Sequence, residues 1–155
     1  MTASCGLLLA FLALPMAVTI ATQPMIAEGI QKLPDCAQKG ESYLTVGNRT
    51  LLATEVLVAV QEATGPKPTS MKYDCDLEFF ALFYLKNLKK LYFSLTSNLD
   101  VAMLKFQGIA ENFGKEVPRK MKKRMLLFEQ VILKRRFGCN YSIAGGRYRV
   151  VCLFV

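Results

Sequence analysis

Histidine is missing from this chain, and its absence excludes more chemistry than any residue that is present. Ser-His and Cys-His nucleophile pairs, histidine-ligated metal sites and histidine general bases are all impossible without it. The cysteines also lack the Cys-x-x-Cys spacing typical of a zinc site. Catalysis by carboxylates alone stays formally open. We therefore expect a protein that is not an enzyme, with no catalytic residue, no cofactor and no metal site.

Charge is missing from residues 1–27, which include an apolar run of signal-peptide length. The small residues Thr19 and Ala21 suit cleavage by a signal peptidase after Ala21. An uncleaved membrane anchor is the alternative, but Pro15 interrupts the apolar stretch, which is short for a membrane span. The pattern predicts a signal peptide over residues 1–21, no transmembrane anchor and a secreted, extracellular protein.

Removal of the signal peptide leaves an even number of cysteines. These are Cys36, Cys75, Cys139 and Cys152. In a secreted chain such a set predicts a disulfide framework, for which four cysteines allow three connectivities.

A β-hairpin is predicted over residues 137–155, at the C-terminal end. Gly145 and Gly146 can take the positive φ angles of a two-residue turn. In the register centred on this turn, Cys139 lies opposite Cys152 at a non-hydrogen-bonded pair. Cα atoms of such a pair are about 4.5 Å apart, within the range of a disulfide.

This hairpin pairing leaves Cys36 to bond with Cys75. The same register separates two faces of the hairpin, and a one-residue slip would scramble both. The apolar face holds Cys139, Tyr141, Ile143, Tyr148, Val150 and Cys152. The other face holds Asn140, Ser142, Arg147 and Arg149, and only Val151 is out of place on it.

Three helices are predicted before the hairpin. The first covers residues 50–63 and is capped by its first residue or by Asn48, although its valines also allow a strand. The clearest helix covers residues 74–91, with acidic residues in its first turn, lysines near its end and a broad apolar face. A third helix is predicted from about residue 100 to 117, ended by Pro118.

Positive charge is concentrated between residues 115 and 136, which hold nine basic and two acidic residues in a chain of net charge +8. A surface of this kind attracts sulfated polysaccharide, anionic lipid or nucleic acid. The plainer alternative is a solvated loop that keeps the protein soluble. The candidate basic patch consists of Arg119, Lys120, Lys122, Lys123, Arg124, Lys134, Arg135 and Arg136. Between its two halves, residues 125–133 are predicted to form a buried strand.

Two Asn-x-Ser/Thr sequons begin at Asn48 and Asn140. Tripeptides of this kind are common by chance and gain meaning only beside a signal peptide. In a secreted chain both asparagines are candidate N-glycosylation sites.

Several segments resemble a known family when taken in order. Residues 71–78 place an aromatic-Asp-Cys run and a glutamate at the opening of a helix, and residues 110–116 read Ala-Glu-Asn-Phe-Gly-Lys-Glu. Residues 127–139 contain Leu-Phe-Glu-Gln followed by Phe-Gly-Cys, and residues 148–152 read Tyr-Arg-Val-Val-Cys. This order is similar to that of a divergent CAP (SCP/TAPS) domain, of the type found in the activation-associated secreted proteins of parasitic nematodes.

The resemblance covers about residues 48–155 and leaves residues 22–47 as an N-terminal extension. It implies an α+β fold, namely an α-β-α sandwich with about three helices and a small antiparallel sheet of three C-terminal strands, held by disulfides. The family's cleft usually gathers two histidines and two glutamates around a divalent cation. Here only Glu116 matches a cleft carboxylate, Leu127 occupies a histidine position, and Asn48 stands weakly in the first His-Asn pair. The resemblance thus implies a scaffold that has lost its cation cleft.

We expect a secreted, non-enzymatic interaction protein, and the nematode resemblance suggests a host-directed effector or immunomodulator. One alternative is a lipid- or sterol-binding module, in which Phe79, Phe83 and Phe106 would line a pocket. Another is a cationic protein that binds glycosaminoglycans or anionic membranes. The partner is therefore expected to be an extracellular protein, a polyanion or a lipid, and no nucleic acid is expected.

Overall fold

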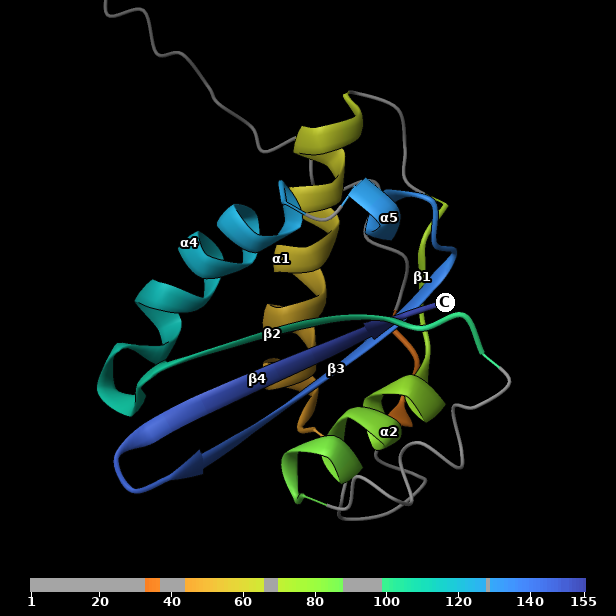
Figure 1. Ribbon diagram of the computed structural model, residues 1–155. Helices are drawn as coiled ribbons and strands as arrows, with labels where there is room; N and C mark the ends of the chain where they lie inside the picture. The colour runs from red at the N-terminus through yellow and green to blue at the C-terminus, as the bar shows by residue number, and fades with distance from the viewer. Residues whose placement is uncertain (1–32, 37–43, 66–69, 88–98, 128) are drawn as a thin grey trace, which may run out of the picture.

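The computed structural model describes residues 33–36, 44–65, 70–87, 99–127 and 129–155. In chain order, the elements of this described part are α1 (Val46–Thr64), β1 (Lys72–Tyr73), α2 (Cys75–Leu85), β2 (Ala102–Ile109), the 3-10 helix η2 (Ala110–Asn112), α4 (Phe113–Met125), α5 (Glu129–Ile132), β3 (Arg136–Ala144) and β4 (Arg147–Phe154). The strands form one mixed sheet in the order β1-β3-β4-β2, in which β1 runs parallel to β3 and the other neighbours are antiparallel (Figure 1).

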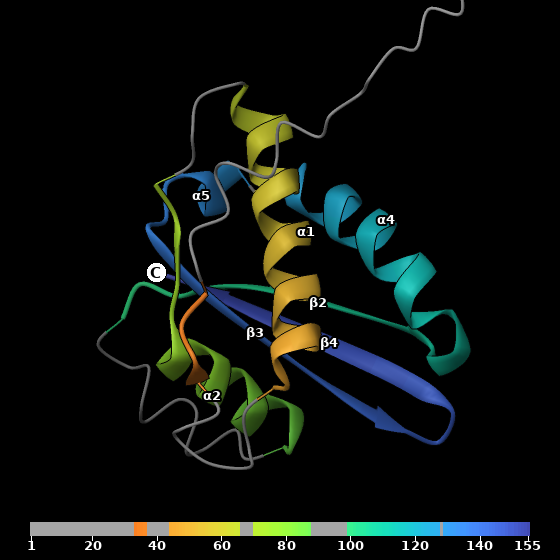
Figure 2. The same ribbon diagram turned by 180° about the vertical axis from the view of Figure 1, so that it is seen from behind.

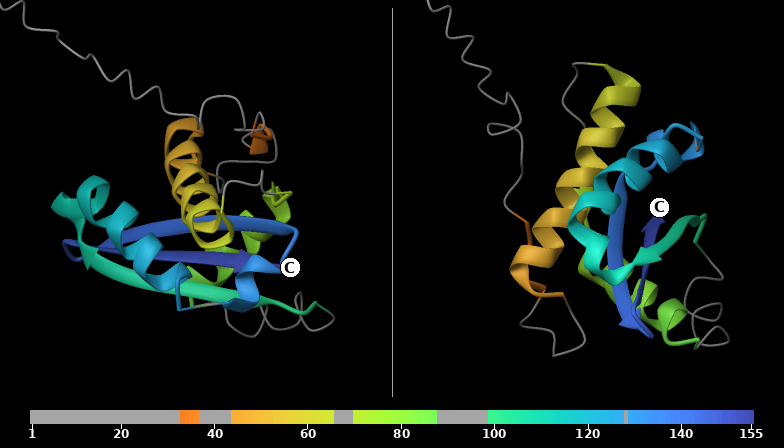
Figure 3. Two further views of the ribbon diagram at one scale, coloured as in Figure 1. Left: turned by 90° about the horizontal axis from the view of Figure 1, so that it is seen from above. Right: turned by 90° about the vertical axis from the view of Figure 1, so that its left-hand side faces the viewer.

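Helices cover both faces of this sheet. α1 and α4 pack on one face, which Figure 2 shows from the α1 side, and α2 packs on the other (Figure 3). The core under α1 and α4 includes Leu52, Val56, Leu104, Phe106, Val117, Met121, Phe137, Tyr148, Val150 and Phe154. The core under α2 consists of Leu77, Ala81, Leu85, Val151 and Leu153. The predicted α+β sandwich is confirmed, with a four-stranded mixed sheet in place of three antiparallel strands.

The C-terminal hairpin has the predicted register. Gly145 and Gly146 form its turn with φ angles of 56° and 68°, which residues with a side chain rarely adopt. Cys139 faces Cys152 across the two strands, with their Cα atoms 4.0 Å apart. Both predicted disulfides are present: Cys139–Cys152 and Cys36–Cys75.

The second face of the hairpin is a core rather than a polar surface. Val151 is only 2% exposed because α2 packs over it, so it is not out of place. Gly138 allows this close approach, since a Cβ atom there would collide with the backbone of α2 at Leu77 and Glu78. The same face is polar only toward the turn, where Arg147 and Arg149 are exposed.

The first two helices form with small shifts in their ends. α1 begins at Val46, earlier than predicted, and Thr45 caps it by accepting a hydrogen bond from the Asn48 N–H. Asp74 caps α2 as predicted and accepts from two backbone N–H groups of its first turn. α2 ends at Leu85, and residues 88–91 of the predicted helix lie outside the described residues.

The prediction of a helix over residues 100–117 is wrong in its first part, where residues 102–109 form β2. Leu104, Phe106 and Gly108 face the core, whereas Lys105 and Gln107 between them are exposed. This period of two is that of a strand. The helical spacing of Phe106 with later residues arises because a strand and the following helix turn toward the same core.

α4 lies where the sequence predicted a charged loop and a helix end at Pro118. Its apolar residues recur every fourth position and face the core: Phe113, Val117, Met121 and Met125. Pro118 cannot donate to the carbonyl of Gly114, but Gly114 is exposed, so water can take the place of the missing donor. The buried stripe outweighs the one lost hydrogen bond.

The predicted buried strand over residues 125–133 is also wrong. These residues form the end of α4, a turn and the short helix α5. Leu126, Leu127 and Leu133 are 57%, 69% and 83% exposed. β1 and β4 occupy both edges of β3, so no place beside β3 is left for another strand.

Within the part of the chain that the structure describes, no helix is both long and apolar enough to cross a membrane. The predicted signal peptide over residues 1–21 lies outside the described residues.

Candidate functional site: a cationic groove

A groove of about 740 Å³ opens beside β2, between the C-terminal parts of α2 and α4. Three consecutive residues of β2, the outer strand of the described sheet, line it together with three of the neighbouring strand β4, so it runs along this edge rather than over one face alone. The lining residues described are Tyr84, Leu85, Asn87, Lys105, Phe106, Gln107, Lys120, Lys123, Arg124, Leu127, Arg149, Val150 and Val151.

The charge of this lining has one sign. Its basic residues are Lys105, Lys120, Lys123, Arg124 and Arg149, and none of the described lining residues is acidic. A concave site that has low-dielectric walls and carries only positive charges concentrates anions from solution. Apolar side chains between the cations give the groove a second kind of contact, to the apolar part of a ligand.

Two of the cations are held in place by the end of α2. Arg149 donates a hydrogen bond to the carbonyl of Leu85, in the last turn of that helix, where a positive charge is favourable. Lys105 donates to the hydroxyl of Tyr84 at 3.2 Å, and its Nζ atom lies 5.7 Å from the centre of the Tyr84 ring. These contacts fix the cations of the α2 wall.

On the α4 wall, only one of the three cations has an ion-pair partner within the described chain. Lys120 pairs with Glu116, one turn earlier in α4, and donates a hydrogen bond to the carbonyl of Gln107. Among the described residues, neither Lys123 nor Arg124 has an ion-pair partner, and both are exposed. They are the cations best placed to bind an external anion.

Glu116, the predicted remnant of a cation cleft, lies at one end of this wall and is already satisfied. Its carboxylate accepts hydrogen bonds from Lys120 and from the Tyr148 hydroxyl. The Lys120 ammonium and the Tyr148 hydroxyl hold the pKa of Glu116 below its usual value. Gly108 makes room for this cluster, because a Cβ atom there would collide with Glu116 and the Tyr148 ring. Glu116 therefore acts here as the partner of a lysine.

Three of the eight residues of the predicted basic patch lie in the groove. Lys120, Lys123 and Arg124 line the groove, and the other five lie outside its described lining. The side chain of Lys122 pairs with Glu62 of α1. Beyond α4, Lys134 pairs with Asp100 and Arg136 pairs with Asp74, while Arg119 and Arg135 are exposed.

Sequence reasoning missed Lys105 and Arg149 as parts of the site. The sequence places Arg149 on the polar face of the hairpin, but nothing in it shows that α2 ends beside this residue. Lys105 was hidden by the helix prediction, because only a strand puts it at the sheet edge. The alternation of apolar and polar residues around Lys105 is the signal that could have found it.

The two candidate glycosylation sites differ in accessibility. Asn140 is 2% exposed, and its side chain donates a hydrogen bond to the carbonyl of Glu78. A glycan on Asn140 is incompatible with this packing, so burial in the folded chain disfavours this site, and glycosylation of Asn140 stays an untested prediction. Asn48 is partly exposed and donates to the hydroxyl of Tyr141, and its glycosylation stays a prediction.

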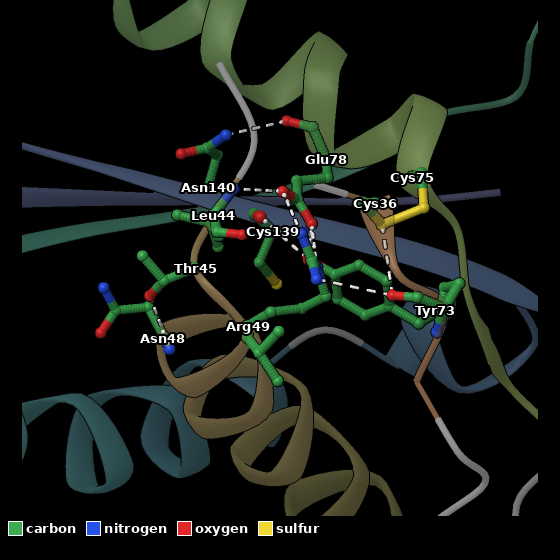
Figure 4. A network of polar contacts seen from close by, with 12 residues as sticks. Cys36, Leu44, Thr45, Asn48, Arg49, Tyr73, Cys75, Glu78, Cys139 and Asn140 are labelled. Atoms are coloured by element: carbon green, nitrogen blue, oxygen red, sulfur yellow. Dashed lines mark hydrogen bonds and ion pairs between the residues drawn. A yellow bond between two sulfur atoms is a disulfide. The ribbon is translucent and has the colours of Figure 1, made fainter. Parts of the chain in front are cut away.

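A buried polar network that the sequence did not indicate lies between α1 and α2 (Figure 4). The Arg49 guanidinium and the Glu78 carboxylate form an ion pair at 2.8 Å, with side chains 1% and 0% exposed. Glu78 also accepts hydrogen bonds from the Leu44 N–H at 2.6 Å and the Tyr73 hydroxyl at 2.7 Å. Burial and the adjacent Glu78 carboxylate raise the pKa of the Tyr73 hydroxyl well above its usual value.

The carboxylate at the centre of this network is fully buried. Arg49 also donates to the carbonyls of Leu44 and Pro34, and Cys36 nearby is bonded to α2. The network and the disulfide thus tie residues 33–36 and 44–45 to the domain, although the sequence assigned them to an extension.

Among the described residues, no group of three or more histidine, cysteine, aspartate or glutamate side chains is arranged to hold a metal ion. Leu127, which stands where the resembled family has a histidine, is 69% exposed and lines the groove.

Comparison with known proteins places the chain in a family. Residues 36–154 match the family model described as "ASPRs: Ancylostoma-associated secreted protein related". None of the curated proteins compared with the chain matches it. The matched range begins at Cys36, in agreement with the contacts of the N-terminal segment described above.

Hookworm secreted proteins are among the solved structures that are similar. Ancylostoma-secreted protein Ac-ASP-7 is 23% identical, with a TM-score of 0.45, over 74% of this chain and 72% of that protein. Its manganese-bound form is 21% identical, with a TM-score of 0.47 and the same coverage. Na-ASP-1 is 15% identical, with a TM-score of 0.45, over 74% of this chain and 38% of that protein. The family model spans most of the chain, and on that match the protein belongs to the ASPR family, the relatives of Ancylostoma-associated secreted proteins.

Proposed function

We propose that this chain is a secreted, non-enzymatic interaction protein that binds an anionic extracellular partner in the cationic groove. One observation carries the proposal: five basic side chains and no acidic one line the described part of a groove of about 740 Å³. Membership of a family of secreted proteins and two disulfides support an extracellular site of action. A host-directed role would follow if the partner proves to be a host molecule.

The absence of histidine from the whole sequence supports a binding role over an enzymatic one. General acid–base catalysis uses an accessible acid beside an accessible base. Glu78 is buried and Glu116 is paired with a lysine, so neither carboxylate provides such an arrangement. Binding by Lys123 and Arg124 needs only exposed charge on a fixed helix, which α4 provides.

A fluorescein-labelled heparin octasaccharide is a suitable polyanion with which to test this proposal by fluorescence anisotropy. Lys123→Gln/Arg124→Gln should weaken its binding roughly tenfold, because each exposed charge contact contributes up to about 1 kcal/mol. The matched control is Lys115→Gln/Lys122→Gln, which removes two charges from the same helix outside the groove lining. Binding should also fall steeply as salt is added.

Equal weakening by both double variants would mean that the protein attracts polyanions by net charge alone, and the groove would lose its assigned role. Failure of the wild-type protein to bind the octasaccharide or any other anionic probe would reject the proposal as a whole. Circular dichroism of each variant checks that the fold is retained.

Lipid binding is a second candidate, favoured by the apolar part of the groove. Phe106, one of the three phenylalanines named for a lipid pocket, lines the groove together with Leu127, which is 69% exposed. Phe79 and Phe83 contact each other, with their ring centres 4.5 Å apart, and lie outside the described lining. A fatty acid that binds in salt-resistant fashion, without competition from the octasaccharide, would favour this second function.

A further inference from the structure

In the described part of the sheet, the outer edge of β2 offers backbone N–H groups without a partner to the groove. Antiparallel strands exchange hydrogen bonds only at alternate residue pairs. The two-residue turn makes Ala144 and Arg147 a hydrogen-bonded pair, which leaves Cys139 and Cys152 at a non-hydrogen-bonded pair. Cys152 therefore directs its N–H and C=O groups away from β3, toward its partner Leu104 in β2.

The same alternation determines to which side each backbone N–H and C=O group of β2 points. Leu104, Phe106 and Gly108 bond to β4, so Met103, Lys105 and Gln107 direct their N–H and C=O groups outward. The hydrogen bond from Lys120 to the Gln107 carbonyl agrees with this direction. Within the described chain, no residue accepts from the outward N–H groups of Lys105 and Gln107. β2 is eight residues long and thus presents a ready template for another strand.

The residues on the two side walls of the groove indicate which side chains such a strand should have. On the α4 side, Lys123 and Arg124 have no ion-pair partner in the described chain and call for acidic side chains. On the α2 side, Lys105 and Arg149 already have acceptors, and Leu85 and Val151 add apolar surface. Side chains of an added strand alternate between these two walls.

We propose that the groove binds an extended peptide of alternating acidic and apolar residues, which adds to the free edge of β2 as a fifth strand of the sheet. This inference rests on the proposed function and specifies its partner and binding mode. Backbone hydrogen bonds to Lys105 and to the N–H of Gln107 would give affinity, and the two walls would give specificity. It also explains why the cations lie beside an open strand edge rather than on an isolated helix face.

The probe is a fluorescein-labelled, N-acetylated octapeptide of alternating glutamate and valine. Wild-type protein should bind it, with loss of affinity at high salt. Gln107→Pro removes one outward N–H and leaves the bonds to β4 intact, a position at which an edge strand tolerates proline. It should weaken peptide binding about tenfold, whereas the matched Gln107→Ala, which keeps the N–H, should bind within about twofold of wild type.

Methylated peptides make the test independent of any protein variant. One octapeptide carries N-methyl groups on its valines and the other on its glutamates, so both have the same charge and length. In strand addition only every second N–H of the peptide bonds to β2, so one methylated peptide should lose binding and the other should retain it. Equal affinities of the two peptides would overturn strand addition.

The heparin octasaccharide separates the two proposals. If it binds through Lys123 and Arg124 while the octapeptide does not bind, the groove takes a polyanion and the strand-addition inference is wrong. If neither probe binds, the proposed function fails as well. Lysines at the edge would then serve only to prevent strand pairing with other chains.

Discussion

Glu78→Gln is expected to be one of the most destabilising single-atom changes in the described part of this protein. The substitution keeps the shape of the side chain but removes its charge. Arg49, only 1% exposed, would then keep a buried positive charge without a compensating carboxylate. The new amide N–H₂ group would also point at a donor, the N–H of Leu44 or the hydroxyl of Tyr73.

The magnitude follows from the burial of the pair. Removing one partner of a buried ion pair costs about 3–5 kcal/mol. A typical domain is stable by only about 5–15 kcal/mol in total. With a urea m-value near 2 kcal/mol/M, the unfolding midpoint should fall by about 2 M.

Urea unfolding at neutral pH with both disulfides intact measures this effect, followed by circular dichroism. Tyr73→Phe is the matched control, since it removes the hydrogen bonds of this hydroxyl to Glu78 and to the Cys139 backbone without removing a charge, and it should cost about 2 kcal/mol. Arg49→Met/Glu78→Gln should be more stable than Glu78→Gln alone, because it removes the unpaired charge. A loss below about 1 kcal/mol for Glu78→Gln, or no recovery in the double variant, would refute the reasoning.

Three further predictions concern the disulfides, the pH response and glycosylation. Cys36→Ser/Cys75→Ser opens a loop of 39 residues and should lower stability by about 4 kcal/mol in the chain-entropy model; a loss under about 1 kcal/mol in urea unfolding would contradict it. The pKa of Glu116 is lowered by Lys120 and Tyr148, so the stability from this contact is present above the unfolded pKa near 4.3 and is lost as pH falls through the lower folded value. An NMR titration midpoint of Glu116 at or above that of an exposed glutamate would contradict this sign, and Lys120→Met should move the midpoint upward. Asn140 should carry no glycan in the secreted protein, because its side chain is buried against α2; a glycopeptide containing Asn140 in the folded protein would disprove the packing.

The sequence predicted best what local geometry determines. The glycine pair fixes the turn, the turn fixes the register, and the register brings Cys139 to Cys152. Likewise Asp74 at a helix start is a local signal, and it caps α2 as expected. In each case neighbouring residues along the chain are enough to decide the structure.

The rest depended on which face of each element is buried, and that is a tertiary property. Phe106 and Val117 suit one helix by spacing, yet a strand and a helix place them in the same core. Pro118 is a local stop signal that the buried stripe of α4 overrides. Arg49 and Glu78 are far apart in the sequence, so no short sequence pattern predicts their ion pair. The sequence did not predict the groove. It indicated the α4 cations as part of a charged run, whereas Lys105 and Arg149 join them only through the fold.

The central claim, that an anionic partner binds in the groove, is tested most directly by NMR mapping. ¹⁵N-labelled protein is titrated with the heparin octasaccharide, and shifts of the backbone amides are followed. We predict that the largest shifts occur at Lys105, Gln107, Lys123 and Arg124, which line the groove. The amides of residues 134–136, which are equally basic but lie outside it, should stay nearly unchanged. Shifts centred on residues 134–136, or spread evenly over all exposed lysines and arginines, would contradict the account.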